Sequence, residues 1–274
     1  MLTACVTSNL EKQYSIRCWN QQHIAIRGDD CHVPIMDIDG NIVRTITTDT
    51  ENGPSDVVIL DEQNIIYIKY YSKHIVFVKN METTQELKTV TTTDWYPIQL
   101  CVSRPSYILV CVCFQEYHDS KDQGRKVLQY TSTGELIREI RYHFNRPLFI
   151  AENINSDIIV NDYYSVKTKY LVKAVSSREY LRFIYDGSVE FGFASTVGPG
   201  GLDCDTLGHI IIADHYNNNI HIINKDGGFV RFLLNENHYV DKLWGMCFDG
   251  VDSIWITELE SKKYKQFRYM TVEG

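Results

Sequence analysis

The feature that most limits the possible folds of this chain is a short motif that recurs along its length. The motif places a basic residue among apolar ones, as in Val43-Arg44-Thr45-Ile46 and Leu181-Arg182-Phe183-Ile184. Its basic residue falls at positions 44, 88, 138, 182 and 231, so successive copies are 44, 50, 44 and 49 residues apart. Self-similarity at a nearly constant spacing is the signature of a repeat architecture. We therefore expect a chain built from repeated units.

A second set of residues recurs at about the same spacing as the basic residues, which form a column when the units are aligned. Pro54, Pro97, Pro147 and Pro199 each precede a short apolar segment, and the units also contain two further β-rich runs. Each unit thus holds four short strands in roughly 45 residues, and the whole chain holds about six units. Almost no segment has a sustained period of 3.6, which excludes helical repeats. Four strands per unit at this spacing predict a β-propeller.

We expect an all-β fold, a single six-bladed β-propeller of four-stranded antiparallel blades over residues 1–274. The predicted blades are 14–50, 51–93, 94–143, 144–190, 197–236, and 240–274 together with 1–8. The last unit has only three strands, while the chain begins with the alternating segment Leu2-Thr3-Ala4-Cys5-Val6. An N-terminal strand that completes the last blade closes the ring and removes two free sheet edges, which are otherwise an aggregation liability. The basic column is expected on the outermost strands, where charge protects an edge.

The fifth unit resembles the NHL repeat. Residues 201–214 read Gly-Leu-Asp-Cys-Asp-Thr-Leu-Gly followed by an apolar run that ends in Ala-Asp, and an Asn-containing turn and a second apolar run follow. The sixth unit matches at its start, and units two to four match more loosely. NHL propellers commonly form the C-terminal part of tripartite-motif ubiquitin ligases and bind protein partners or single-stranded RNA. The chain lacks the Cys/His spacing of a RING finger, so the resemblance implies a recognition function without ligase chemistry.

The turns between the second and third strands, together with the linkers between blades, are expected on one face of the propeller. Exposed tyrosine and histidine side chains there offer a large contact area with polar tips, which suits a binding surface. The alternative is that these aromatic side chains cap the blades and pack on their neighbours. The predicted partner-binding residues are Tyr70, Tyr71, Lys73, Trp95, Tyr96, Tyr117, His118, Arg146, Tyr163, Tyr164, Lys167, His215, Tyr216 and Tyr239.

The charge balance bears on the class of partner. Lys and Arg number 27 against 35 Asp and Glu, which argues against a global positive field for nucleic acid or an anionic membrane. Single-stranded RNA remains an alternative through a local patch, since aromatic side chains stack on bases and basic ones contact phosphates. The eight cysteines include no Cys-x-x-Cys, and the start has no basic region followed by an apolar one. We expect a cytoplasmic monomer with reduced thiols and no contact with membranes.

A catalytic function is the remaining class. Some six-bladed propellers are lactonases with a calcium ion in the central channel, a site that needs several converging oxygen ligands. Asp203 is the one carboxylate at the channel-facing repeat position of the inner strands, where Val58, Cys101, Ala151 and Cys247 cannot bind a hard cation. The sequence therefore predicts a non-enzymatic module without metal or cofactor that recognises a protein or peptide. A calcium-dependent, lactonase-like hydrolase is the further alternative.

Two acidic residues at the ends of second strands have a structural interpretation. Asp162 and Asp214 are expected to accept hydrogen bonds from backbone groups of the adjacent turns. No Gly-x-Ser-x-Gly, His-Glu-x-x-His or phosphate-loop signature occurs.

Overall fold

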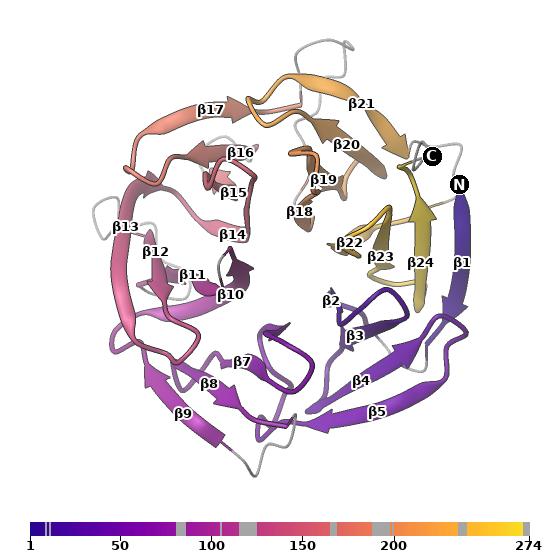
Figure 1. Cartoon of the computed structure of the whole chain (residues 1–274), viewed down its shortest axis with the longest axis horizontal. Coiled ribbons are helices and arrows are strands. Elements are labelled where there is room, and N and C mark those ends of the chain that lie inside the picture. Colours follow the sequence, from indigo (N-terminus) through magenta and orange to yellow (C-terminus); the bar gives the residue numbers. More distant parts are fainter. Residues whose placement is uncertain are drawn as a thin grey trace.

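The computed structural model describes residues 1–8, 10, 12–80, 86–104, 106–114, 125–164, 169–187, 198, 200–234 and 240–270. Within these ranges all 24 elements are β-strands, grouped in six sheets of four. The sheets stand around a central axis like the blades of a propeller (Figure 1). The predicted all-β, six-bladed fold is confirmed. None of the described segments forms a helix that is long and apolar enough to cross a membrane.

In five blades the strands follow the chain from the centre to the rim, and each is antiparallel to the next. The first two blades are β2 (Ser15–Cys18), β3 (His23–Arg27), β4 (His32–Asp37) and β5 (Ile42–Thr47), then β6 (Val57–Ile59), β7 (Ile65–Lys69), β8 (His74–Val78) and β9 (Glu86–Thr91). The third and fourth are β10 (Tyr96–Ser103), β11 (Tyr107–Cys113), β12 (Arg125–Tyr130) and β13 (Leu136–Phe144), then β14 (Pro147–Glu152), β15 (Ile158–Tyr164), β16 (Lys169–Val175) and β17 (Leu181–Tyr185). The fifth is β18 (Leu202–Cys204), β19 (Ile210–Asp214), β20 (Asn219–Ile223) and β21 (Phe229–Leu234).

The sixth blade draws its strands from both ends of the chain. From the centre outward it contains β22 (Leu243–Phe248), β23 (Ser253–Glu258), β24 (Lys263–Arg268) and β1 (Leu2–Thr7). β1 pairs antiparallel with β24, with Cys5 opposite Lys265 and Val6 opposite Tyr264. Figure 1 shows β1 at the rim of this blade, beside β24. The expected closure of the ring by the N-terminal strand is confirmed.

The apolar residues of the strands are buried between blades. The described residues contain six clusters of buried apolar side chains, and each cluster joins two neighbouring blades. The cluster at the closure packs Ile16 and Ile24 of the first blade against Trp255 and Tyr264 of the sixth. Because both faces of the middle strands are covered, β19 is buried along its whole length instead of alternating. The ring therefore has one core interface per pair of blades.

The basic column bridges blades. Arg44 lies on β5 and donates from Nη2 to the carbonyl of Asn80 in the second blade at 2.6 Å. Arg182 on β17 donates in the same way to Asp226 Oδ1 of the fifth blade at 3.2 Å. The same bridge joins Arg138 to the Ser177 carbonyl and Arg231 to the Tyr269 carbonyl. These arginines lie on outermost strands, as expected. Three of their acceptors, Asn80, Ser177 and Asp226, precede the outermost strand of the next blade, and the fourth, Tyr269, directly follows β24.

Deletion of residues 2–7 tests the closure. The truncated chain loses the ladder to β24, whose hydrogen bonds contribute about 1 kcal/mol each. At roughly 2–4 °C per kcal/mol for a chain of this size, we expect Tm to fall by about 10 °C or more, with aggregation through the exposed edge. Leu2→Ser is the control, since Leu2 is 49% exposed. A truncated chain with the melting curve of the full chain would contradict terminal closure.

Candidate functional site in the central channel

The strand register aligns one position of every innermost strand. Arg17 pairs with Ala25 across β2 and β3, and Asp203 pairs with Ile211 across β18 and β19. By the same register this level of the channel holds Arg17, Val58, Cys101, Ala151, Asp203 and Cys247. Arg17 was not among the residues expected here. The channel at this level thus carries one cation, one carboxylate and two thiols.

Arg17 is held by the neighbouring blades. Its Nη2 lies 2.8 Å from Asp56 Oδ2, and its Nε donates to the Val57 carbonyl at 3.2 Å. Asp56 also accepts the hydroxyl of Ser15 and the N–H of Leu100, at 3.1 and 2.9 Å. Burial works against the charge of Arg17, but the nearby Asp56 carboxylate outweighs it and raises the pKa of the guanidinium. This network joins the first three blades at the channel wall.

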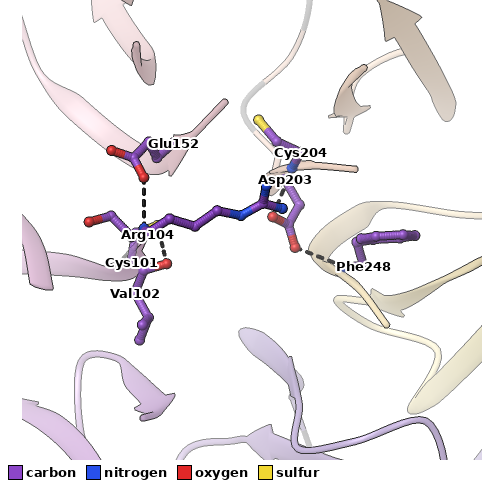
Figure 2. A pocket seen from close by; sticks show the side chains of 8 residues that line it. Cys101, Val102, Arg104, Glu152, Asp203, Cys204 and Phe248 are labelled. Atoms are coloured by element: carbon purple, nitrogen blue, oxygen red, sulfur yellow. Dashed lines mark hydrogen bonds between the residues drawn. The ribbon is translucent and has the colours of Figure 1, made fainter. Parts of the chain in front are cut away.

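A pocket of about 180 Å³ opens beside this level of the channel. It lies where β10, β14, β18 and β22 end, so four different blades contribute to its wall (Figure 2). The lining residues are Cys101, Val102, Ser103, Arg104, Glu152, Asp203, Cys204 and Phe248.

Two carboxyl groups face this pocket. Asp203 accepts the backbone N–H of Cys204 through Oδ1 and that of Phe248 through Oδ2, both at 2.8 Å. Burial raises the pKa of Asp203, although these two N–H groups and the charge of Arg17 oppose the shift. Burial also raises the pKa of Glu152, whose Oε2 accepts the N–H of Arg104 at 2.8 Å. Carboxyl groups whose pKa is raised toward neutrality are suited to proton transfer.

Two further polar side chains line the pocket, those of Ser103 and Arg104. The Ser103 hydroxyl is buried, and among the described residues it has no hydrogen-bond partner. Figure 2 shows the Arg104 side chain extended across the view of the pocket, from the side of Glu152 toward the side of Asp203 and Cys204. An unsatisfied buried hydroxyl is costly, so it is stabilised by a ligand that bonds to it.

The thiols of the pocket are unsuited to nucleophilic attack. Burial raises the pKa of Cys101 to about 12, and burial also raises the pKa of Cys204. Because the thiolate is the reactive form, both groups react slowly near neutral pH.

The calcium alternative does not fit the residues of the channel. In the described part of the chain, no group of three or more His, Cys, Asp and Glu side chains is arranged to hold a metal ion. Asp203 is the one carboxylate at its level of the channel, whereas a calcium ion requires six to eight oxygen ligands.

The predicted tyrosine-rich face lies at the opposite end of the inner strands. β10 begins at Tyr96, next to Trp95, and ends at Ser103 in the pocket. Seven residue steps at about 3.3 Å each separate the two ends by roughly 23 Å. None of the predicted partner-binding residues therefore lines the pocket, whereas the sequence had assigned Asp203 to the channel under the hydrolase alternative.

In the second and third blades this face holds aromatic side chains with partners. Tyr70 packs on Tyr96 with ring centroids 5.2 Å apart, and Lys73 Nζ lies 4.5 Å from the centroid of the Tyr96 ring. Lys126 Nζ lies 4.2 Å from the centroid of the Trp95 ring. Tyr71 contacts Tyr70 edge-on and remains 75% exposed.

A second aromatic group spans the fourth, fifth and sixth blades. Tyr163 packs on Tyr170, and Tyr170 meets the 59% exposed Tyr216 at 6.0 Å. His215 contacts Trp244 and donates from Nδ1 to the Leu243 carbonyl at 3.0 Å. Arg146 donates its backbone N–H to Asp162. Tyr117, His118, Lys167, Tyr239 and the side chain of Tyr164 lie outside the described residues.

The acidic residues at the ends of second strands have the expected structural role. Asp162 accepts the N–H groups of Asn145 and Arg146 and pairs with Lys173 Nζ at 2.6 Å. Asp214 accepts the N–H of Gly198 at 2.8 Å and lies 3.3 Å from His221 Nε2. Both carboxylates hold a linker between blades, and Asp214 also accepts the N–H groups of Tyr216 and Asn217 in the adjacent turn, as predicted.

Comparison with known proteins identifies the fold and no family. No family model matches the chain, and no curated protein matches it. Among solved structures, a gluconolactonase from Xanthomonas campestris aligns with a TM-score of 0.66 and 13% identity, covering 96% of this chain and 89% of its own. A virginiamycin B lyase from Staphylococcus aureus aligns with a TM-score of 0.61 and 14% identity, covering 97% of this chain and 99% of its own. A luciferin-regenerating enzyme aligns with a TM-score of 0.66 and 7% identity, covering 94% of this chain and 91% of its own.

These neighbours correct one expectation. The prediction of a chain without enzymatic activity is wrong, because the three solved propellers named above, which align over nearly its whole length, are enzymes. The prediction rested on the absence of local catalytic motifs. At 7–14% identity the comparison establishes the fold alone, so the reaction has to be argued from the pocket.

Asp214 offers a test of the linker contacts. Burial alone would raise its pKa, but hydrogen bonds from His221, Asn217 and Gly198 outweigh burial and lower it. Because its pKa is lowered, the ionised Asp214 stabilises the fold at pH values above its ordinary pKa of 3.8. This stability is lost as the pH falls below that value. We expect Asp214→Ala to cost about 3 kcal/mol at pH 7 and less near pH 3, measured by urea unfolding. Asp226→Ala, on an exposed ion pair, is the control and should change the free energy of unfolding far less. Equal losses for the two variants would contradict the assigned role.

Proposed function

We propose that this chain is an enzyme that opens a small cyclic ester in the channel pocket. The observation that carries the proposal is the pair of carboxyl groups with raised pKa, Asp203 and Glu152, on the wall of one pocket with Arg104 and Ser103. The names of the structural neighbours, a gluconolactonase and streptogramin-type lyases, support ring opening as the class of reaction.

The size of the pocket supports a small substrate. A volume of about 180 Å³ equals the share of about six water molecules, which suits a single sugar-sized ring. It lies below the range of roughly 300–1,000 Å³ that is typical of drug-sized ligands.

The residues divide the proton transfers of hydrolysis between them. Asp203, whose carboxylate accepts two backbone N–H groups, takes a proton from water as the water oxygen attacks the ester carbonyl. Arg104 and the Ser103 hydroxyl stabilise the negative charge that develops on the carbonyl oxygen. Glu152 in its protonated form gives a proton to the ring oxygen as the carbon–oxygen bond breaks. One water is consumed and one hydroxy acid is formed.

Asp203→Asn tests this proposal. A panel of small lactones, beginning with gluconolactone, is assayed by pH-stat in the presence of EDTA, since the channel residues do not fit a calcium site. We expect wild type to open at least one lactone above background, and the variant to lose about 10²–10⁴-fold in kcat. Because the pKa of Asp203 is raised, the wild-type rate should fall with decreasing pH through a midpoint above 3.8.

The controls separate catalysis from folding. Asp226→Asn, at an exposed carboxylate, should retain the wild-type rate, and circular dichroism should show all variants folded. Wild type that opens no lactone faster than Asp203→Asn would contradict the proposal.

A second candidate function is recognition of a protein or peptide by the tyrosine-rich face. The specific observation is that Tyr71 and Tyr216 are 75% and 59% exposed while each packs on another aromatic residue that orients it. The fifth unit resembles the NHL repeat in sequence, although no family model matches the chain.

A double variant tests this surface. Tyr71→Ala with Tyr216→Ala should weaken partner capture by about 30-fold, since buried aromatic anchors typically contribute about 2 kcal/mol or more. Tyr180→Ala is the matched control, because Tyr180 is 54% exposed and lies in the turn between β16 and β17, at the other end of the blade. Full retention of every partner by the folded double variant would count against this face.

A further inference from the structure

Two thiols meet where the ring closes. Cys18 is the last residue of β2 in the first blade, and Cys247 lies on β22 in the sixth. Their Sγ atoms are 2.7 Å apart, although 229 positions separate the two residues in the chain. A disulfide bond is about 2.05 Å long, so the two sulfur atoms need to approach by less than 1 Å. The packing of the innermost strands has thus brought together two groups that can form a bond.

We propose that Cys18 and Cys247 are an oxidation site, at which a reversible disulfide links the first blade to the sixth. The inference does not depend on the proposed enzymatic activity. It rests on the contact between the two sulfur atoms and on their position at the single junction between the ends of the ring. β1 already joins the two ends of the chain at the rim of the sixth blade, and the disulfide adds a covalent link at the centre.

The oxidant is a low-molecular-weight disulfide such as oxidised glutathione. The thiolate of Cys18, which is the more exposed of the two, attacks one sulfur of the oxidant and releases one glutathione thiol. The thiolate of Cys247 then attacks the mixed disulfide, forms the intramolecular bond and releases the second glutathione. Two electrons pass from the protein to the oxidant, and the two thiol protons end on the two released glutathione molecules.

The surroundings make the pair slow to react and the product well protected. Burial raises the pKa of Cys18, and the nearby Cys247 and Asp203 add to the shift. Cys247 is 4% exposed, so a bond to it is shielded from external thiols. Cys5, by contrast, is exposed on β1 and has no sulfur partner among the described residues, so a stable mixed disulfide is expected there.

The bond should stabilise the ring because it closes a loop of more than 200 residues in the unfolded chain. It also holds the interface between Ile16 and Trp255, which has to open when the first and sixth blades separate. The wall of the channel pocket is adjacent, since Phe248 follows Cys247 directly.

Mass spectrometry of the folded chain tests the proposal. Wild-type protein is incubated with oxidised glutathione, its free thiols are blocked with N-ethylmaleimide, and it is digested without reduction. We expect a peptide pair linked through Cys18 and Cys247 that disappears when dithiothreitol is added. Oxidised protein should melt about 5–10 °C above reduced protein. Cys18→Ser and Cys247→Ser should each remove this difference, whereas Cys5→Ser should retain it.

The linked peptide is measured on the wild-type chain, so the result does not depend on whether the serine variants fold. Wild type in which Cys18 and Cys247 are still free after prolonged oxidation, while Cys5 carries glutathione, would overturn the proposal. A glutathione adduct that remains on Cys18 without transfer to Cys247 would overturn it as well.

Discussion

The pairing of β1 with β24 is the interaction on which the rest of the structure depends. Each cluster of buried apolar side chains is shared by two neighbouring blades, so an open ring would leave one of the interfaces without its partner. The closing strand gives the sixth blade its fourth strand and covers the edge of β24. The channel depends on the same closure, since Arg17 of the first blade and Cys247 of the sixth approach each other only in a complete ring.

Much of the architecture could be predicted from the spacing of residues. A period near 45 residues with four apolar runs per unit leaves few alternatives to a propeller, and the missing fourth strand of the last unit points to the N-terminal segment. The first unit was harder, because it lacks the proline that marks units two to five and the apolar segment that marks units two to six. Arg17 was therefore not predicted to lie in the channel, although the strand register places it level with Asp203.

The basic residues of the repeat show that a sequence period predicts positions within a blade but does not predict contacts between blades. Their place on the outermost strands follows from the repeat, but the four arginines among them also contact groups on the next blade. Arg44 reaches the Asn80 carbonyl and Arg182 reaches Asp226. A period identifies equivalent positions within the units, and it does not show which turn of the neighbouring unit lies within reach. An arginine interpreted as protection of an edge is thus a link between blades.

The pocket could not be predicted for a related reason. Glu152, Asp203 and Arg104 come from three blades, and no local motif connects residues that far apart in the chain. Propellers host different reactions because each blade supplies one or two side chains to a shared channel. The raised pKa values of Asp203 and Glu152 arise from burial in the assembled ring, which is a property of tertiary structure. The absence of catalytic signatures in the sequence therefore carried no information about catalysis.

Native-state hydrogen exchange of the full chain tests the central claim, that the two ends of the chain form one blade. Exchange is followed for the backbone amides of β1, β24 and the buried strand β19. The account predicts that the amides of β1 which bond to β24 are protected to a degree comparable with β24 itself, because the two strands open together. Amides of β1 that exchange as fast as those of an unpaired terminus, while β24 and β19 stay protected, would contradict it.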